Sequence, residues 1–115
     1  MARTSEINLA ITLDEKNIPE RMVWDATDAQ VEGIKETQAM LFALWDAQAK
    51  TGLSIDLWTK EMTVQEMNLF FYQTFMTMSE TFQRATNNLV LSQMIHKFAQ
   101  EFIDEVKRQE KAEIK

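Results

Sequence analysis

The sequence predicts an α+β protein in which a four-stranded antiparallel sheet is followed by two C-terminal helices packed on one face of that sheet. Two observations lead to this class. The first half of the chain alternates apolar and polar residues with the period of a strand, and from residue 63 onward the apolar residues recur at helical spacing. Strands followed by helices, rather than alternating with them, are typical of an antiparallel sheet covered on one side. We expect a single domain, residues 1–115, with strands within about 4–60 and helices at about 63–85 and 88–110.

Four segments carry the strand pattern: Ile7–Leu13, Arg21–Ala26, residues 37–47 (TQAMLFALWDA) and residues 53–60 (LSIDLWTK). The third segment is apolar on both sides, which favours a central strand with both faces covered. Residues 27–36 (TDAQVEGIKE) are polar around a glycine and form the longest predicted loop. We expect the four strands to follow one another as a simple meander.

The helix pattern begins with a recognisable cap. Thr63 and Glu66 form a Thr-x-x-Glu capping box, in which each side chain can accept a bond from the other's free backbone N–H. Residues 86–88 (TNN) can end this helix and cap the next one. Each helix carries an apolar stripe, made by Val64, Met67, Phe71, Phe75, Met78 and Phe82 in the first and by Leu91, Met94, Ile95, Phe98, Phe102 and Val106 in the second.

Composition excludes several classes of function. The formal net charge is −6, with 12 basic and 18 acidic residues and no basic patch, so nucleic acid is not expected as a partner. Cysteine is absent, which excludes thiolate catalysis and cysteine-ligated metals. The longest charge-free run, Met67–Ser79, is shorter than the roughly 20 apolar residues of a membrane helix. We expect a cytoplasmic protein with no membrane insertion and no cofactor.

No catalytic motif is present. His96 is the sole histidine, so a multi-histidine metal site is excluded, and no nucleophile or orienting acid accompanies it in a motif. Glu101, Asp104 and Glu105 have the spacing of a solvated helix face. A site of paired carboxylates is the remaining enzymatic alternative, and it would have to be assembled from Asp25, Asp28, Asp46 and Asp56. We expect a protein without catalytic, cofactor-binding or metal-binding residues.

The tryptophans suggest a contact surface. If Leu9, Val23, Phe42 and Ile55 point toward the helices, all three tryptophans fall on the opposite side of the sheet. Tryptophan is enriched in protein interfaces because it buries a large apolar area and keeps an N–H for a partner. The predicted surface consists of Met22, Trp24, Leu41, Trp45, Asp56 and Trp58. The alternative is that a bulge or twist returns one or two tryptophans to the core.

Several segments resemble a known family. "TSEINL", "VWDATD", "LFALWDA" and "IDLWTKEM" followed by "VQEM" are similar, in this order, to the gliding motility-associated GldC family, from about Thr4 to the middle of the first helix. The resemblance implies a soluble, non-enzymatic accessory protein needed for efficient movement of cells over surfaces. It implies protein partners in the motility apparatus, and the exposed apolar residues suggest a homo-oligomer. The alternative is a chaperone-like or small-ligand-binding domain, since the export chaperone SecB has the same layout of elements, a likeness of fold alone.

Overall fold

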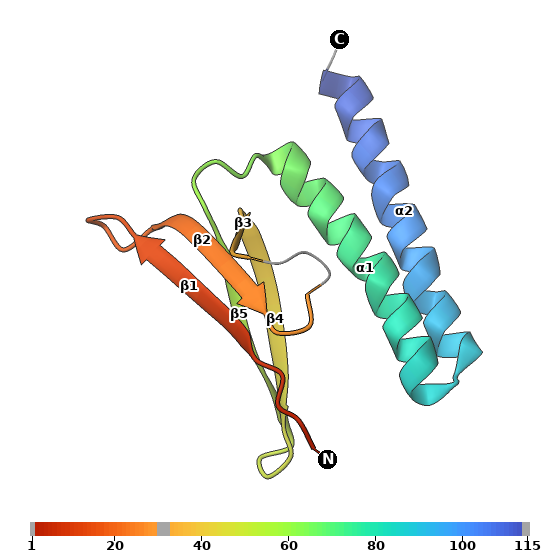
Figure 1. Ribbon diagram of the computed structural model, residues 1–115. Coiled ribbons are helices and arrows are strands. Elements are labelled where there is room, and N and C mark those ends of the chain that lie inside the picture. The colour runs from red at the N-terminus through yellow and green to blue at the C-terminus, as the bar shows by residue number, and fades with distance from the viewer. Residues whose placement is uncertain (1, 30–32, 114–115) are drawn as a thin grey trace. The chain divides into compact units, whose positions relative to one another are not determined.

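The computed structural model describes residues 2–29 and 33–113 of the chain (Figure 1). The chain divides into two compact units, a strand unit, Met1–Met62, and a helix unit, Thr63–Lys115. The architecture is α+β with the strands preceding two C-terminal helices, as predicted. The single domain and the packing of the helices on one sheet face stay predictions, and each unit is described by itself below.

The strand unit contains two antiparallel sheets. The first has the order β1-β2-β3, from β1 (Ile7–Leu13), β2 (Pro19–Ala26) and β3 (Lys35–Thr37), and the second pairs β4 (Ala39–Asp46) with β5 (Thr51–Trp58). The prediction of one four-stranded sheet is therefore wrong. The predicted third strand is interrupted at Gln38: the part before it pairs with β2 and the part after it pairs with β5. The predicted loop 27–36 overlaps β3, and its residues 30–32 lie outside the described residues.

The turn between β1 and β2 is held by one carboxylate. Asp14 Oδ1 accepts the backbone N–H groups of Lys16, at 2.8 Å, and Ile18, at 3.0 Å, and its other oxygen pairs with Lys60. These partners, the Lys60 ammonium first, hold the pKa of Asp14 below its ordinary value. Asn17 takes the left-handed conformation, with φ 64°, which asparagine tolerates better than most residues. The turn thereby sets the register in which Leu9 faces Trp24.

The helix unit is an antiparallel pair of helices, α1 (Val64–Thr86) and α2 (Leu89–Glu113) (Figure 1). The predicted capping box is confirmed: Thr63 Oγ1 accepts the Glu66 N–H at 3.0 Å, and the Glu66 carboxylate accepts the Thr63 N–H at 3.3 Å. Asn87, with φ 55°, ends α1 in the left-handed conformation, and Asn88 caps α2 by accepting the Leu91 N–H. Both helices begin one residue later than predicted and end one to three residues later.

Two serines and a cluster of aromatic rings join the helices. Ser79 Oγ donates to the Ser92 carbonyl at 2.8 Å, and Ser92 Oγ donates to the Ser79 carbonyl at 2.9 Å. Both serines are buried, and their small side chains let the two backbones approach closely. The Phe75 ring meets those of Phe98 and Phe102 edge to face, with centroids 5.2 and 5.3 Å away. No helix within the described residues is long and apolar enough to cross a membrane.

Candidate functional site

The β4–β5 hairpin carries the strongest candidate surface, and its turn fixes which residues share a face. Asp46 Oδ1 accepts the N–H groups of Gln48, at 3.0 Å, and Ala49, at 3.2 Å, while Lys50 takes the left-handed conformation with φ 53°. This turn sets a register in which Trp45 lies opposite Gly52 and Trp58 lies opposite Ala39. Directly opposed residues in an antiparallel pair point to the same side, so the hairpin has two distinct faces.

We call one of them the tryptophan face; it consists of Leu41, Trp45, Asp56 and Trp58, with the smaller Ala39, Ala43, Gly52 and Ser54 between them. The side chains are open: Trp45 is 69 % exposed, Trp58 56 % and Leu41 38 %. Trp45 and Trp58 stand at opposite ends of the hairpin, about 20 Å apart for a six-residue separation along strands. Each ring lies opposite a small residue of the other strand, and between the two rings lie the pairs Leu41–Asp56 and Ala43–Ser54.

The other side of the hairpin bears Phe42 opposite Ile55 and Leu44 opposite Leu53. This confirms that Phe42 and Ile55 share a side and that Trp45 and Trp58 lie on the reverse. Leu44, Leu53 and Ile55 are exposed as well. The hairpin therefore presents apolar side chains on both of its faces. The prediction that the third segment is a central strand with both faces covered is wrong, because β4 pairs with β5 alone and its Leu44 and Trp45 are exposed.

The other half of the predicted face assignment is wrong. Leu9 is paired with Trp24, so these two side chains share one side of the first sheet, and Val23 lies on the reverse with Ala10. Trp24 is half-buried, and the Lys35 ammonium lies 4.7 Å from the centroid of its ring. Met22 is 1 % exposed and belongs to the core of the strand unit. Alternation along each strand was readable from the sequence, but the register between strands was not.

The predicted surface residues thus fall into two groups. Leu41, Trp45, Asp56 and Trp58 are brought together on the tryptophan face, whereas Met22 and Trp24 belong to the first sheet. A buried Met22 has no accessible side chain to offer a partner. The Asp56 carboxylate lies opposite Leu41, and within the described residues it forms no ion pair.

Three of the four aspartates of the paired-carboxylate alternative serve different local structures, and the fourth, Asp56, lies on the tryptophan face. Asp25 accepts a bond from the Asn8 amide at 3.1 Å, Asp28 binds the side chains of Arg3 and Ser5, and Asp46 holds the hairpin turn. The Ser5 hydroxyl first, and then the Arg3 guanidinium, keep the pKa of Asp28 below its ordinary value. Across residues 2–29 and 33–113 no three His, Cys, Asp or Glu side chains gather as metal ligands would. Asp25, Asp28 and Asp46 therefore belong to three separate local structures.

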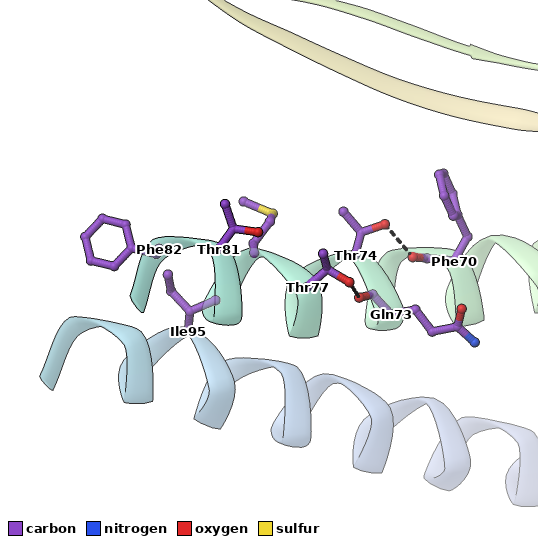
Figure 2. A pocket seen from close by; sticks show the side chains of 8 residues that line it. Phe70, Gln73, Thr74, Thr77, Thr81, Phe82 and Ile95 are labelled. Carbon is purple, nitrogen blue, oxygen red and sulfur yellow. Dashed lines mark hydrogen bonds between the residues drawn. The ribbon is translucent and has the colours of Figure 1, made fainter. Parts of the chain in front are cut away.

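A second feature lies in the helix unit, a groove of about 550 Å³ along α1 that also touches Ile95 of α2 (Figure 2). Its lining comes from positions repeating every four residues: Phe70, Thr74, Met78 and Phe82 in one row and Gln73, Thr77 and Thr81 in the next. The Thr74 hydroxyl donates to the Phe70 carbonyl at 2.7 Å and the Thr77 hydroxyl to the Gln73 carbonyl at 3.0 Å. With these hydroxyls bonded to backbone, the groove is mostly apolar. The predicted apolar stripe of the first helix contains Met78 and Phe82 of this lining, whereas Phe70 lies outside that stripe.

Comparison with known proteins adds one match. The family model described as gliding motility-associated protein GldC-like matches residues 19–108, from the start of β2 to near the end of α2. No curated protein matches, and no solved structure matches.

Proposed function

The chain belongs to the gliding motility-associated GldC-like family, and on this premise we propose that it is a non-enzymatic accessory protein that supports motility by binding a protein component of the motility apparatus through its tryptophan face. The observation that supports this most is the exposure of Trp45 and Trp58 on one face of a hairpin whose turn and register are tightly fixed. Exposed tryptophans cost solubility in an isolated protein, and they are the residues that contribute most to protein interfaces.

The geometry suggests how a partner would be held. The two exposed rings lie at opposite ends of a surface about 20 Å long and can contact both sides of a partner's helix or strand. The small residues Ala43 and Ser54 between them leave room for side chains of the partner. The Asp56 carboxylate lies between the rings and would favour a partner with a Lys or Arg at that position. We propose that this contact is made in the cytoplasm and that the bound partner covers both rings.

The test is complementation of gliding in cells that lack this protein. Trp45→Ala and Trp58→Ala should restore gliding poorly, and the double variant should not restore it. Leu53→Ala is the matched control, because it removes an exposed apolar side chain from the reverse face of the same hairpin. Circular dichroism of each purified variant verifies the fold. Full gliding by cells that carry a folded double variant would refute the proposal.

A second candidate function follows from the apolar groove of α1. Its row of Phe70, Thr74 and Met78 would accept apolar segments of an unfolded polypeptide or a small apolar ligand, in line with the SecB-like order of elements. Met78→Glu tests it, because a charge in the groove should abolish binding of a reduced, unfolded polypeptide while leaving the tryptophan face intact. Failure of the wild-type protein to bind such polypeptides at micromolar concentration would eliminate this function.

A further inference from the structure

The outer edge of β1 is a strand edge without a partner in the described residues, because β1 ends the order β1-β2-β3. The direction of its backbone groups follows from one contact. The Glu6 carbonyl accepts the Thr27 N–H at 2.9 Å, so the polar groups of Glu6 face β2. Backbone groups alternate in direction along a strand, and those of Ile7, Leu9 and Ile11 therefore point outward.

This edge lacks the devices by which proteins protect free edges. Ile7–Leu13 contains no charged residue and no proline, and all seven residues are exposed. The other strands differ from β1: β2 lies between β1 and β3, β3 has three residues, two of them charged, and β5 carries Asp56. The edge strand β4 is charged only at its last residue, Asp46, but four of its eight residues are partly buried, whereas all seven of β1 are exposed. An exposed, uncharged, apolar edge is a template for pairing with another strand.

The chemistry of β1 matches a second copy of itself. The chain carries a net charge of −6, so two copies repel one another over most of their surfaces, but β1 is charge-free along its length. Its four large apolar side chains share one face and are distributed symmetrically along the strand, with Ile7 and Leu9 before Ala10 and Ile11 and Leu13 after it. An antiparallel pair centred on Ala10 therefore sets Leu9 against Ile11 of the second copy and Ile7 against its Leu13, which is the self-complementarity that a two-fold dimer requires.

We propose that two copies of this chain form a dimer by antiparallel pairing of their β1 strands about Ala10. The two three-stranded sheets join into one, and the exposed apolar row of β1 becomes continuous across the two-fold axis. This inference shares with the proposed function only the premise that the chain acts through protein contacts. It uses a different surface, which lies outside the residues 19–108 matched by the family and leaves the tryptophan face free for the other partner.

The first test uses a single cysteine in a chain that has none. Because Ala10 turns its own backbone groups toward β2, the two Ala10 residues would form a non-hydrogen-bonded pair with Cα atoms about 4.5 Å apart. That distance lies within the range of about 4.4–6.8 Å for a disulfide. Ala10→Cys should form a disulfide-linked dimer on mild oxidation, whereas Ser54→Cys, on the exposed edge strand β5, should not. Cross-linking of Ser54→Cys without cross-linking of Ala10→Cys would overturn the proposal.

The second test measures mass in solution over a micromolar concentration series by light scattering. The wild-type protein should be a dimer, and Ala10→Lys, which opposes two ammonium groups, should raise its dissociation constant about tenfold or more. Ser54→Lys and Trp45→Ala should leave the dimer unchanged, so a failed motility proposal and a failed dimer proposal are distinguishable. A monomeric wild-type protein would overturn the proposal. This holds even if the β1 edge then pairs with a strand of another protein. Should Ala10→Lys fail to fold, the cross-linking of Ala10→Cys decides alone.

Discussion

The helix unit and the strand unit differ in the number and arrangement of their buried residues. In the helix unit Ser79, Ser92, Ala99, Ile103 and Val106 are buried, the last four on one side of α2 at spacings of seven, four and three residues. In the described part of the strand unit the buried residues are Met22 and Thr59, although β1, β4 and β5 are rich in apolar side chains. The two units thus contain similar proportions of apolar residues, but the helix unit buries more of its residues than the strand unit does.

The difference has a geometric cause. Two helices need to close only one interface, and serine and alanine at that interface let the backbones approach and pack closely. A sheet has two faces, and sheets of two or three strands bury neither face by themselves. Apolar residues that a small sheet leaves exposed are available for contacts with other surfaces. The helix unit therefore packs its buried residues between α1 and α2, while the strand unit exposes the apolar residues of the tryptophan face and of the β1 edge.

The largest effect is expected where the helix unit is packed most tightly. Ile103→Ala removes a buried side chain of α2 and should lower the free energy of unfolding by about 3 kcal/mol. Met94→Ala is the matched control, an exposed apolar residue of the same helix that should cost less than about 1 kcal/mol. Urea unfolding followed by the helical circular dichroism signal measures both. Equal losses would show that the exposed side of α2 is covered as well.

Within the strand unit the same contrast should appear between a buried and an exposed residue. Met22→Ala should cost about 2 kcal/mol because it empties the site of the one fully buried large side chain that the described residues contain. Trp45→Ala should change stability by only about 0.5 kcal/mol, although it removes a larger side chain. Hydrogen exchange of the β2 amides reports on both variants. A Trp45→Ala protein as unstable as Met22→Ala would place Trp45 in a core and withdraw the tryptophan face.

The helix unit was the more predictable one, because its signals are local. The Thr63–Glu66 capping box and the Asn87–Asn88 turn lie within four residues of the helix ends that they determine, and all are as expected. The stripes identified the aromatic residues, but not that Ser79 and Ser92 would meet, since that contact joins residues thirteen positions apart. Pairing across two helices depends on their relative register, which no local pattern encodes.

The strand unit was less predictable for the same reason. Four of the five strands were predicted, and the alternation along β4 and β5 correctly placed Leu41, Trp45, Asp56 and Trp58 on one side. The interruption at Gln38 was missed because "TQAMLFALWDA" alternates without a break, and it is the change of partner from β2 to β5 that separates β3 from β4. The error that placed Leu9 on the side of Val23 came from an unknown register, which the Asp14 turn determines.

Ser79 and Ser92 join the two helices through reciprocal hydrogen bonds, and their substitution tests how much these bonds stabilise the helix unit. Ser79→Ala or Ser92→Ala alone should cost about 1 kcal/mol, since each removes a hydroxyl that bonds the other helix's carbonyl. The double variant should cost less than the sum of the two, because the hydroxyls also lie 3.1 Å from each other and a single alanine leaves one partly unpaired. A double-mutant cycle by urea unfolding measures the coupling. Strict additivity would mean that the serines act only through their small size.

The smallest effect concerns an exposed ion pair near the end of α2. Arg108 donates to the Glu105 carboxylate at 2.9 and 2.5 Å and Gln109 donates at 3.0 Å, and these bonds, those of Arg108 first, lower the pKa of Glu105 from 4.5 to about 2. A pKa that is lower in the folded state stabilises the helix above pH 4.5. This contribution is lost as the pH falls toward 2, and salt weakens it because the pair is exposed. Glu105→Gln should therefore lower the Tm slightly at neutral pH and not at pH 2. The control is Glu101→Gln, because Glu101 lies one turn earlier and forms no ion pair within the described residues. Its Tm should show no such dependence on pH. A carboxyl titration by NMR that placed the Glu105 midpoint near 4.5 would show that α2 ends without this bond, and that even the better-packed unit loses its order toward its end.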